Sequence, residues 1–234
     1  MPKQIEQIQL VLFSPGIVIT NKPKLVSNIN DALQGLFDGD LAILPIPEDA
    51  PAEIPRIFLK SNDERCILQI ATKRVNFFYN YRPEDSPIEF PINGLYDKFI
   101  DICKGLIEEV HCQFPRAAQV TRWVIELPGS GAEYVLSTYL REDVLFKDPY
   151  DLELHCLTKE NVSGCKTNKW VRIKSARKAS DPDENNLLTV LIDINTIAEE
   201  EYEFGDVLLT KFLNDSSNIT KETIGAHFIK KESK

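Results

Sequence analysis

Residues 56–81 read RIFLKSNDERCILQIATKRVNFFYNY, and this stretch decides the fold class. It holds three short runs rich in branched and aromatic residues, at 56–60, 65–71 and 74–81, and such runs are typical of β-strands. The links between them contain only four and two residues, which are mostly polar. Links this short join antiparallel neighbours, because parallel strands need a long crossover. The stretch therefore predicts an antiparallel meander.

The last run carries contiguous aromatic residues at 77–79 and again at Tyr81. Successive side chains of a strand point to opposite faces of the sheet, so these rings must face both ways. One set is expected to pack under a helix at 95–113, where apolar residues recur at helical spacing. The other set needs a second cover, for which we expect another layer of the same protein or, next, a contact with a second copy of the chain.

Further elements follow outward from this stretch. We expect the helix at 95–113 to begin after Asn93 as its N-cap and to stop at Pro115. A helix at 25–37 is expected to end at Asp38-Gly39-Asp40. The other expected elements are strands at 8–13, 119–127, 150–158, 168–175 and 187–195, and helices at 132–141, 204–213 and 220–230.

The order of these elements repeats along the chain. Residues 1–115 and residues 116–234 each read strand, helix, three strands, helix. The pattern predicts an α+β fold in which antiparallel sheet, as one sheet or two, is assembled from two similar halves with helices packed on the sheet. We expect the halves to form one compact unit.

The composition indicates the cellular compartment and the class of partner. The formal charge of −9 argues against bulk electrostatic attraction to nucleic acid or anionic lipid, and it suits a basic partner. Neither a signal peptide nor an apolar run long enough to span a membrane is visible. The five cysteines are widely spaced, which indicates reduced thiols. We therefore expect a cytoplasmic protein that does not engage a membrane.

The common catalytic sequence motifs are absent from the sequence. His111-Cys112 and His155-Cys156 are adjacent pairs whose side chains diverge, so they do not supply the converging ligands that zinc needs. Ser130 lacks the Gly-x-Ser-x-Gly frame of a nucleophile elbow, and no glycine-rich phosphate loop occurs. We therefore predict no catalytic residue, no metal site and no cofactor.

One basic segment, 166–178, opposes the overall charge. On a strand, Trp170, Arg172 and Lys174 would share one face, which makes a cationic and aromatic surface suited to single-stranded nucleic acid or to an acidic protein. The residues that we single out for partner binding are Lys169, Trp170, Arg172, Lys174, Arg177 and Lys178.

Several blocks of the chain show a family resemblance. They are 67–70, 74–81, 121–126, 188–194 and 212–214, with 219–220 and Phe228. In these blocks the chain resembles a sporadically distributed family of bacterial and archaeal cytosolic proteins that has no established activity. Arg122 stands alone where the family's strand is richer in arginine. The resemblance implies a fold and no catalytic residue.

Taken together, these observations favour a non-enzymatic cytosolic binding or assembly protein that engages another macromolecule, with an inhibitor or immunity protein as one form. Its partner would be a protein or a second copy of the chain, with nucleic acid less favoured. Two alternatives stay open. One is an enzyme whose site is assembled from remote residues, with Asp193, Glu126 and His155 as candidates. The other is a nucleic-acid binder that uses the basic hairpin at 166–178.

Overall fold

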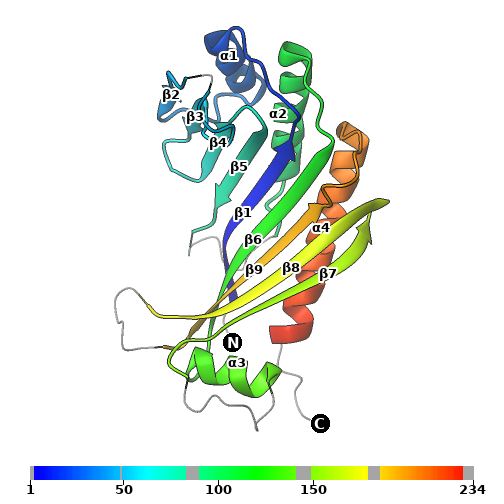
Figure 1. The fold of residues 1–234 in the computed structure, drawn as a ribbon. Helices are drawn as coiled ribbons and strands as arrows, with labels where there is room; N and C mark the ends of the chain where they lie inside the picture. The colour runs from blue at the N-terminus through cyan, green and yellow to red at the C-terminus, as the bar shows by residue number, and fades with distance from the viewer. Residues whose placement is uncertain (1–2, 48, 83–89, 141–148, 179–184, 229–234) are drawn as a thin grey trace.

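The computed structural model describes residues 3–47, 49–82, 90–140, 149–178 and 185–228, and it confirms an α+β fold with an antiparallel sheet and helices packed on it (Figure 1). The strands are β1 (Lys3–Phe13), β2 (Leu41–Ile43), β3 (Ile57–Lys60), β4 (Cys66–Ile70), β5 (Arg74–Asn80), β6 (Arg116–Glu126), β7 (Glu153–Val162), β8 (Cys165–Ala176) and β9 (Leu187–Thr196). The helices are α1 (Lys22–Ala32), α2 (Leu95–Val110), α3 (Gly131–Tyr139) and α4 (Asp206–Phe228).

The strands form one nine-stranded sheet in the order β2-β3-β4-β5-β1-β6-β9-β8-β7. Every pairing is antiparallel, and β3, β4 and β5 follow one another as the meander that 56–81 predicts. The long strands β1 and β6 pair at the middle of the sheet, with a bulge between Ile5 and Gln7. A single sheet therefore joins all the strands of the described residues.

The apolar core lies between the sheet and the helices. Phe77 of β5 stacks on Phe99 of α2, with ring centroids 6.1 Å apart and planes at 9°. Along the same strand Val75 is fully buried, as the alternation of a strand requires. Helix α2 packs beside α1 and also beside α4, so the helices form one layer over one face of the sheet.

The carboxyl ends of α1 and α2 differ from the sequence prediction, and so does the start of α2. Helix α2 begins after Gly94, not Asn93, and it ends at Val110 because His111 adopts a left-handed conformation, with φ of 51°. Pro115 lies beyond this end. Helix α1 ends at Ala32, where Gln34 and Gly35 turn with positive φ, before the predicted stop at Gly39. In both cases a left-handed residue ends the helix earlier than the sequence signal does.

The two helices predicted at the carboxyl end are one. Helix α4 continues through 214–219 because this stretch, which is polar except for Ile219, includes neither glycine nor proline. Two of them are buried serines, and Ser217 hydrogen-bonds both the Tyr96 hydroxyl and, at 3.2 Å, the Gln119 amide. Ser217 thus faces polar partners on α2 and β6, and the helix continues without a break.

The two halves, 1–115 and 116–234, lie on either side of the β1–β6 pair. Their element order differs by the short strand β2, which the sequence did not predict. The similarity of the halves and their origin by duplication stay predictions. Among the described residues, no helix combines the length and the apolar character needed to cross a membrane. Part of the predicted loop at 176–186, and the tail after 228, lie outside the described residues.

Candidate nucleic-acid interface

One face of the sheet is covered by none of the helices that the structure describes. Figure 1 shows β8 and β7 crossing in front of α4, so the viewer faces this open side. On β9, Ile192 and Ile194 point to the helices and are fully buried, while Leu191 and Asp193 point the other way and are only half-buried. The predicted second layer over the aromatic strand is therefore missing from the described part of the chain, where Phe78 lies half-buried on this open face.

Strand register arranges the open-face side chains in rows. In one row Arg122 of β6 lies opposite Leu191 of β9, which lies opposite Arg172 of β8. His155 of β7 continues the row beyond Arg172. Directly opposed side chains have Cβ atoms about 5 Å apart. Two guanidinium groups thus stand on the same face with one leucine between them.

The adjacent row places an aromatic ring beside these cations. Trp170 of β8 lies opposite Asp193 on one side and Leu157 on the other. The guanidinium carbon of Arg172 lies 5.5 Å from the centre of the Trp170 ring, which is cation–π distance. The Nε of Arg172 is buried and has no hydrogen-bond partner among the described residues. We call this pair of a cation and a ring the Trp170 stack.

Asp193 is the acidic group beside this stack. Burial raises the pKa of its carboxyl, while a hydrogen bond from Asn195 and the positive charge of Arg172 act in the opposite direction. The Asn195 amide donates to Oδ1 of Asp193 at 2.9 Å. This bond leaves Oδ2 without a protein hydrogen bond in the described structure, on the face that also carries the Trp170 ring.

A second cationic and aromatic cluster lies at the far end of β1. Phe13 lies between Arg74 of β5 and Arg116 of β6 on the open face. The Arg116 guanidinium carbon is 4.9 Å from the Phe13 ring centre, and its Nη2 donates to the Thr196 carbonyl at 3.0 Å. The Nε of Arg74 is buried without a hydrogen-bond partner in the described chain. The cluster repeats the chemistry of the Trp170 stack.

We define the open-face arginines as Arg74, Arg116, Arg122 and Arg172. Within the described ranges, none of them forms an ion pair with a carboxylate. Of the open-face carboxylates, Glu126 pairs with Lys178 and Glu153 with His155 and Lys174, while Asp193 lies near Arg172. Arg74, Arg116 and Arg122 therefore keep their charge available for an anionic ligand, while Arg172 shares its charge with the nearby Asp193 without a direct ion pair.

The structure separates the six residues that the sequence singles out for partner binding. Trp170, Arg172 and Lys174 share the open face, whereas Lys169 points to the opposite face and pairs with Glu160. Arg177 packs on the ring of Tyr150, with its guanidinium carbon 3.6 Å from the ring centre.

Nearby glutamates form ion pairs with the lysines of this segment. Lys174 lies 3.7 Å from Glu153, and Lys178 lies 2.7 Å from Glu126. The interface thus centres on Trp170 and Arg172 and extends away from the basic hairpin.

Sequence reasoning missed Arg74, Arg116 and Phe13, and it did not assign Arg122 to a site. The signal that could have found them is alternation: Arg74, Asn76 and Phe78 occupy every second position of β5, on the side opposite to the buried Val75 and Phe77. That signal identifies a face but does not show that distant strands share it. Only the strand order brings β5, β6 and β8 into one sheet.

The geometry does not favour the alternative of an enzyme whose site is assembled from residues that are remote in the sequence. Asp193, Glu126 and His155 all lie on the open face, and none of them is among the lining residues of the cavities at the end of α2 and beside α1. Glu126 is engaged by Lys178, and His155 lies 2.6 Å from Glu153. No group of three or more histidine, cysteine or acidic side chains within the described ranges could hold a metal ion.

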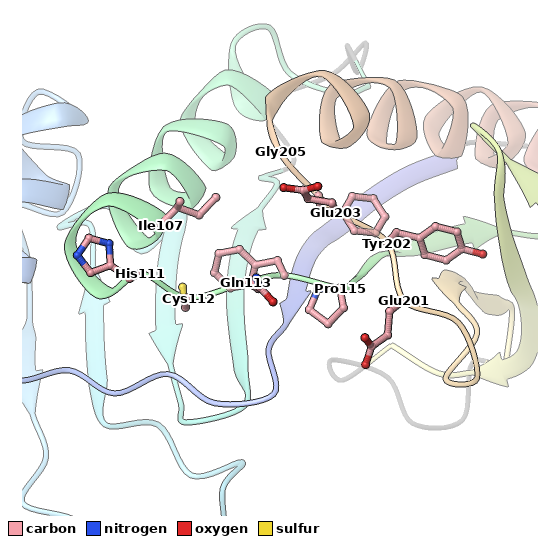
Figure 2. A pocket seen from close by; sticks show the side chains of 11 residues that line it. Ile107, His111, Cys112, Gln113, Pro115, Glu201, Tyr202, Glu203 and Gly205 are labelled. Carbon is pink, nitrogen blue, oxygen red and sulfur yellow. The ribbon is translucent and has the colours of Figure 1, made fainter.

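A cavity of about 660 Å³ lies at the end of α2, beside the segment that leads into α4 (Figure 2). His111, Cys112, Glu201 and Glu203 are among its lining residues. Figure 2 shows His111 turned away from the two glutamates. Burial raises the pKa of the Cys112 thiol to about 11, which keeps it protonated and unreactive at neutral pH. The cavity therefore contains no activated nucleophile.

Comparison with known proteins adds a structural neighbour. No protein-family model matches the chain, and no curated protein sequence matches it. Among solved structures, the chain is similar to a rolling circle replication initiator protein from Geobacillus stearothermophilus, with a TM-score of 0.38 and 12% identity. The match covers 99% of this chain and 89% of the other.

This finding corrects the leading functional expectation. The sequence favoured a non-enzymatic binding or assembly protein, yet the neighbour is described as a replication initiator, and nothing in the comparisons supports a protein-binding role. That expectation is wrong, and we do not retain it. The likeness itself, at this TM-score, carries no argument about the function of this chain. Function is therefore inferred from the open face alone.

Proposed function

We propose that the protein binds single-stranded nucleic acid across the open face of its sheet. The observation that carries this proposal is the set of four open-face arginines, which lack ion pairs in the described structure while two of them pack on aromatic rings. Bases of single strands stack on aromatic rings and on guanidinium planes, and arginine also contacts phosphates. The face supplies both kinds of contact.

The overall charge of −9 does not oppose this role, because charge is unevenly distributed. Helix α2 carries Asp97, Asp101, Glu108 and Glu109 on the layer behind the sheet. The uncompensated arginines are on the front. Beyond about 8–10 Å, salt screens exposed charges at physiological ionic strength, so a strand held at the open face experiences chiefly the local cations.

The direct test is fluorescence anisotropy with labelled single-stranded DNA and RNA of mixed sequence. Trp170→Ala should weaken binding by about 5- to 100-fold, because stacking contributes roughly 1–3 kcal/mol per base. Arg122→Ala and Arg172→Ala should each weaken binding. Each should also lower the salt dependence, by about 0.7 in the slope of log K against log salt for every phosphate that the arginine neutralises.

Lys104→Ala is the matched control, because it changes the net charge by the same amount on α2, behind the sheet. It should leave the affinity unchanged. Equal weakening by Lys104→Ala and Arg172→Ala would show that only net charge matters. Absence of binding by the unmutated protein at 50 mM salt would overturn the proposal outright.

A further inference from the structure

The open face carries a feature that a purely electrostatic interface does not need. When ionised, Asp193 is an anion in the row next to the one that holds Arg122 and Arg172, where it would repel phosphates. Its position is fixed, because Asn195 donates to its Oδ1 at 2.9 Å, and Asn168 in turn donates to the Asn195 side chain at 3.4 Å. An oriented carboxylate beside a stacking ring suggests recognition of hydrogen-bond donors on a base.

The strand register determines which side chains lie next to a base that stacks on Trp170 and Arg172. A base stacked at Trp170 and Arg172 has two neighbours along the row, Asp193 toward β9 and Leu157 toward β7. Leu157 offers no hydrogen bond, and Val120 on the far side of Asp193 offers none either. Asp193 is therefore the polar group of this row that can read the edge of the base.

A carboxylate accepts hydrogen bonds and donates none when it is ionised. Guanine presents two adjacent donors, N1–H and the N2 amino group, which match the two oxygens of one carboxylate. Cytosine and adenine each place a ring-nitrogen acceptor beside their single amino group, and that lone pair would face the second oxygen. Uracil and thymine place carbonyl acceptors on both sides of their one donor. Guanine alone fits without repulsion.

We propose that Asp193 selects guanine at the base position stacked on Trp170 and Arg172. This inference rests on the proposed function, since it concerns the same open face. It adds a base preference to what would otherwise be sequence-independent binding. A bidentate contact of this kind discriminates between bases by about 5- to 100-fold.

The experiment uses dT 12-mers that carry one central guanine, hypoxanthine, adenine or cytosine, with affinity measured by anisotropy at fixed salt. The unmutated protein should bind the guanine oligomer at least about fivefold more tightly than the others. Hypoxanthine lacks the N2 amino group and should lose most of that preference. A 7-deazaguanine oligomer keeps N1–H and N2, so it should bind like guanine.

Asp193→Asn should remove the guanine preference, because the amide pairs one acceptor oxygen with an NH2 donor that would face one of the two guanine donors. Binding of the dT host should become no weaker, because the variant removes an anion that repels phosphates. Glu126→Gln is the matched control: it removes a carboxylate from the same face at a residue held by Lys178, and it should keep the preference. Thermal unfolding of each variant verifies that it folds.

The outcomes separate the two proposals. Binding of the dT host without a guanine preference, or with a preference that survives in Asp193→Asn, would refute guanine selection and leave nucleic-acid binding standing. No binding of any oligomer would refute nucleic-acid binding, and guanine selection with it. A preference lost in Asp193→Asn and kept in Glu126→Gln supports both.

Discussion

Asp193 shows how a position on a sheet changes the chemistry of a residue. The sequence places it opposite to Ile192 and Ile194, which predicts a solvent-facing carboxylate. The structure half-buries it between β6 and β8, and burial raises the pKa of its carboxyl above the ordinary value. Burial disfavours the ionised form of a carboxyl group. Asp193 should therefore reduce stability once it loses its proton.

This destabilisation gives a prediction about pH. The folded-state pKa of Asp193 is raised, so the protonated carboxyl contributes to the free energy of unfolding. This contribution is fully present below the unfolded-state pKa and is lost as pH rises through the folded-state pKa. Asp193→Asn cannot ionise and can still accept the Asn195 hydrogen bond. The free energy of unfolding of the variant should match that of the parent near pH 3.5 and exceed it at pH 7. Urea unfolding at both pH values measures the difference, and a variant that is less stable at pH 7 would contradict this account.

At the scale of the element, the start of α3 depends on the absence of a side chain. A Cβ on Gly131 would lie 2.5 Å from the Leu187 carbonyl oxygen and 3.3 Å from a Leu188 methyl carbon. The helix thus begins against the first residues of β9, with the Ser130 hydroxyl accepting from the Glu133 N–H as its cap. A side chain at Gly131 would push α3 away from the sheet.

Gly131→Ala should therefore lower the free energy of unfolding by about 1–3 kcal/mol, as overpacking does. Gly129→Ala is the matched control, because nothing lies within 4 Å of its Cβ position. The control should be neutral or raise stability by up to about 1 kcal/mol. Chemical denaturation of the two variants measures the contrast, and equal effects would show that the close approach to β9 does not constrain α3.

At the scale of the whole molecule, the continuous sheet predicts cooperative unfolding. The two halves share the β1–β6 pairing and the contact between α2 and α4. Both tryptophans, Trp123 and Trp170, lie in residues 116–234. Unfolding followed by tryptophan fluorescence should therefore coincide with unfolding followed by far-ultraviolet circular dichroism, which reports on both halves. A dichroism transition at lower denaturant than the fluorescence transition would show that residues 1–115 unfold separately.

Local pattern predicted most elements because the periods of strands and helices are properties of short segments. The meander at 56–81, the strand at 187–195 and the apolar stripe of α2 all follow from such periods. The errors fall at helix ends, at β1 and β2, of which β1 begins before the predicted strand and β2 was not predicted, and at α4, where polar residues were taken for a break. Ser217 is buried there because Tyr96 and Gln119, both distant in sequence, hydrogen-bond it.

The sequence by itself determined the α+β class, the antiparallel meander and the shared face of Trp170, Arg172 and Lys174, because each depends on neighbours along the chain. Only the tertiary structure decided which charges stay uncompensated. Lys169 and Lys174 pair with Glu160 and Glu153 across the β7–β8 hairpin, whereas the pairs of Lys166 with Glu200 and of Lys178 with Glu126 join segments 34 and 52 residues apart in the sequence. The same strand order brings Arg74, Arg116, Arg122 and Arg172 onto one face. Coulombic interactions depend on distance in space, so local sequence patterns do not reveal them.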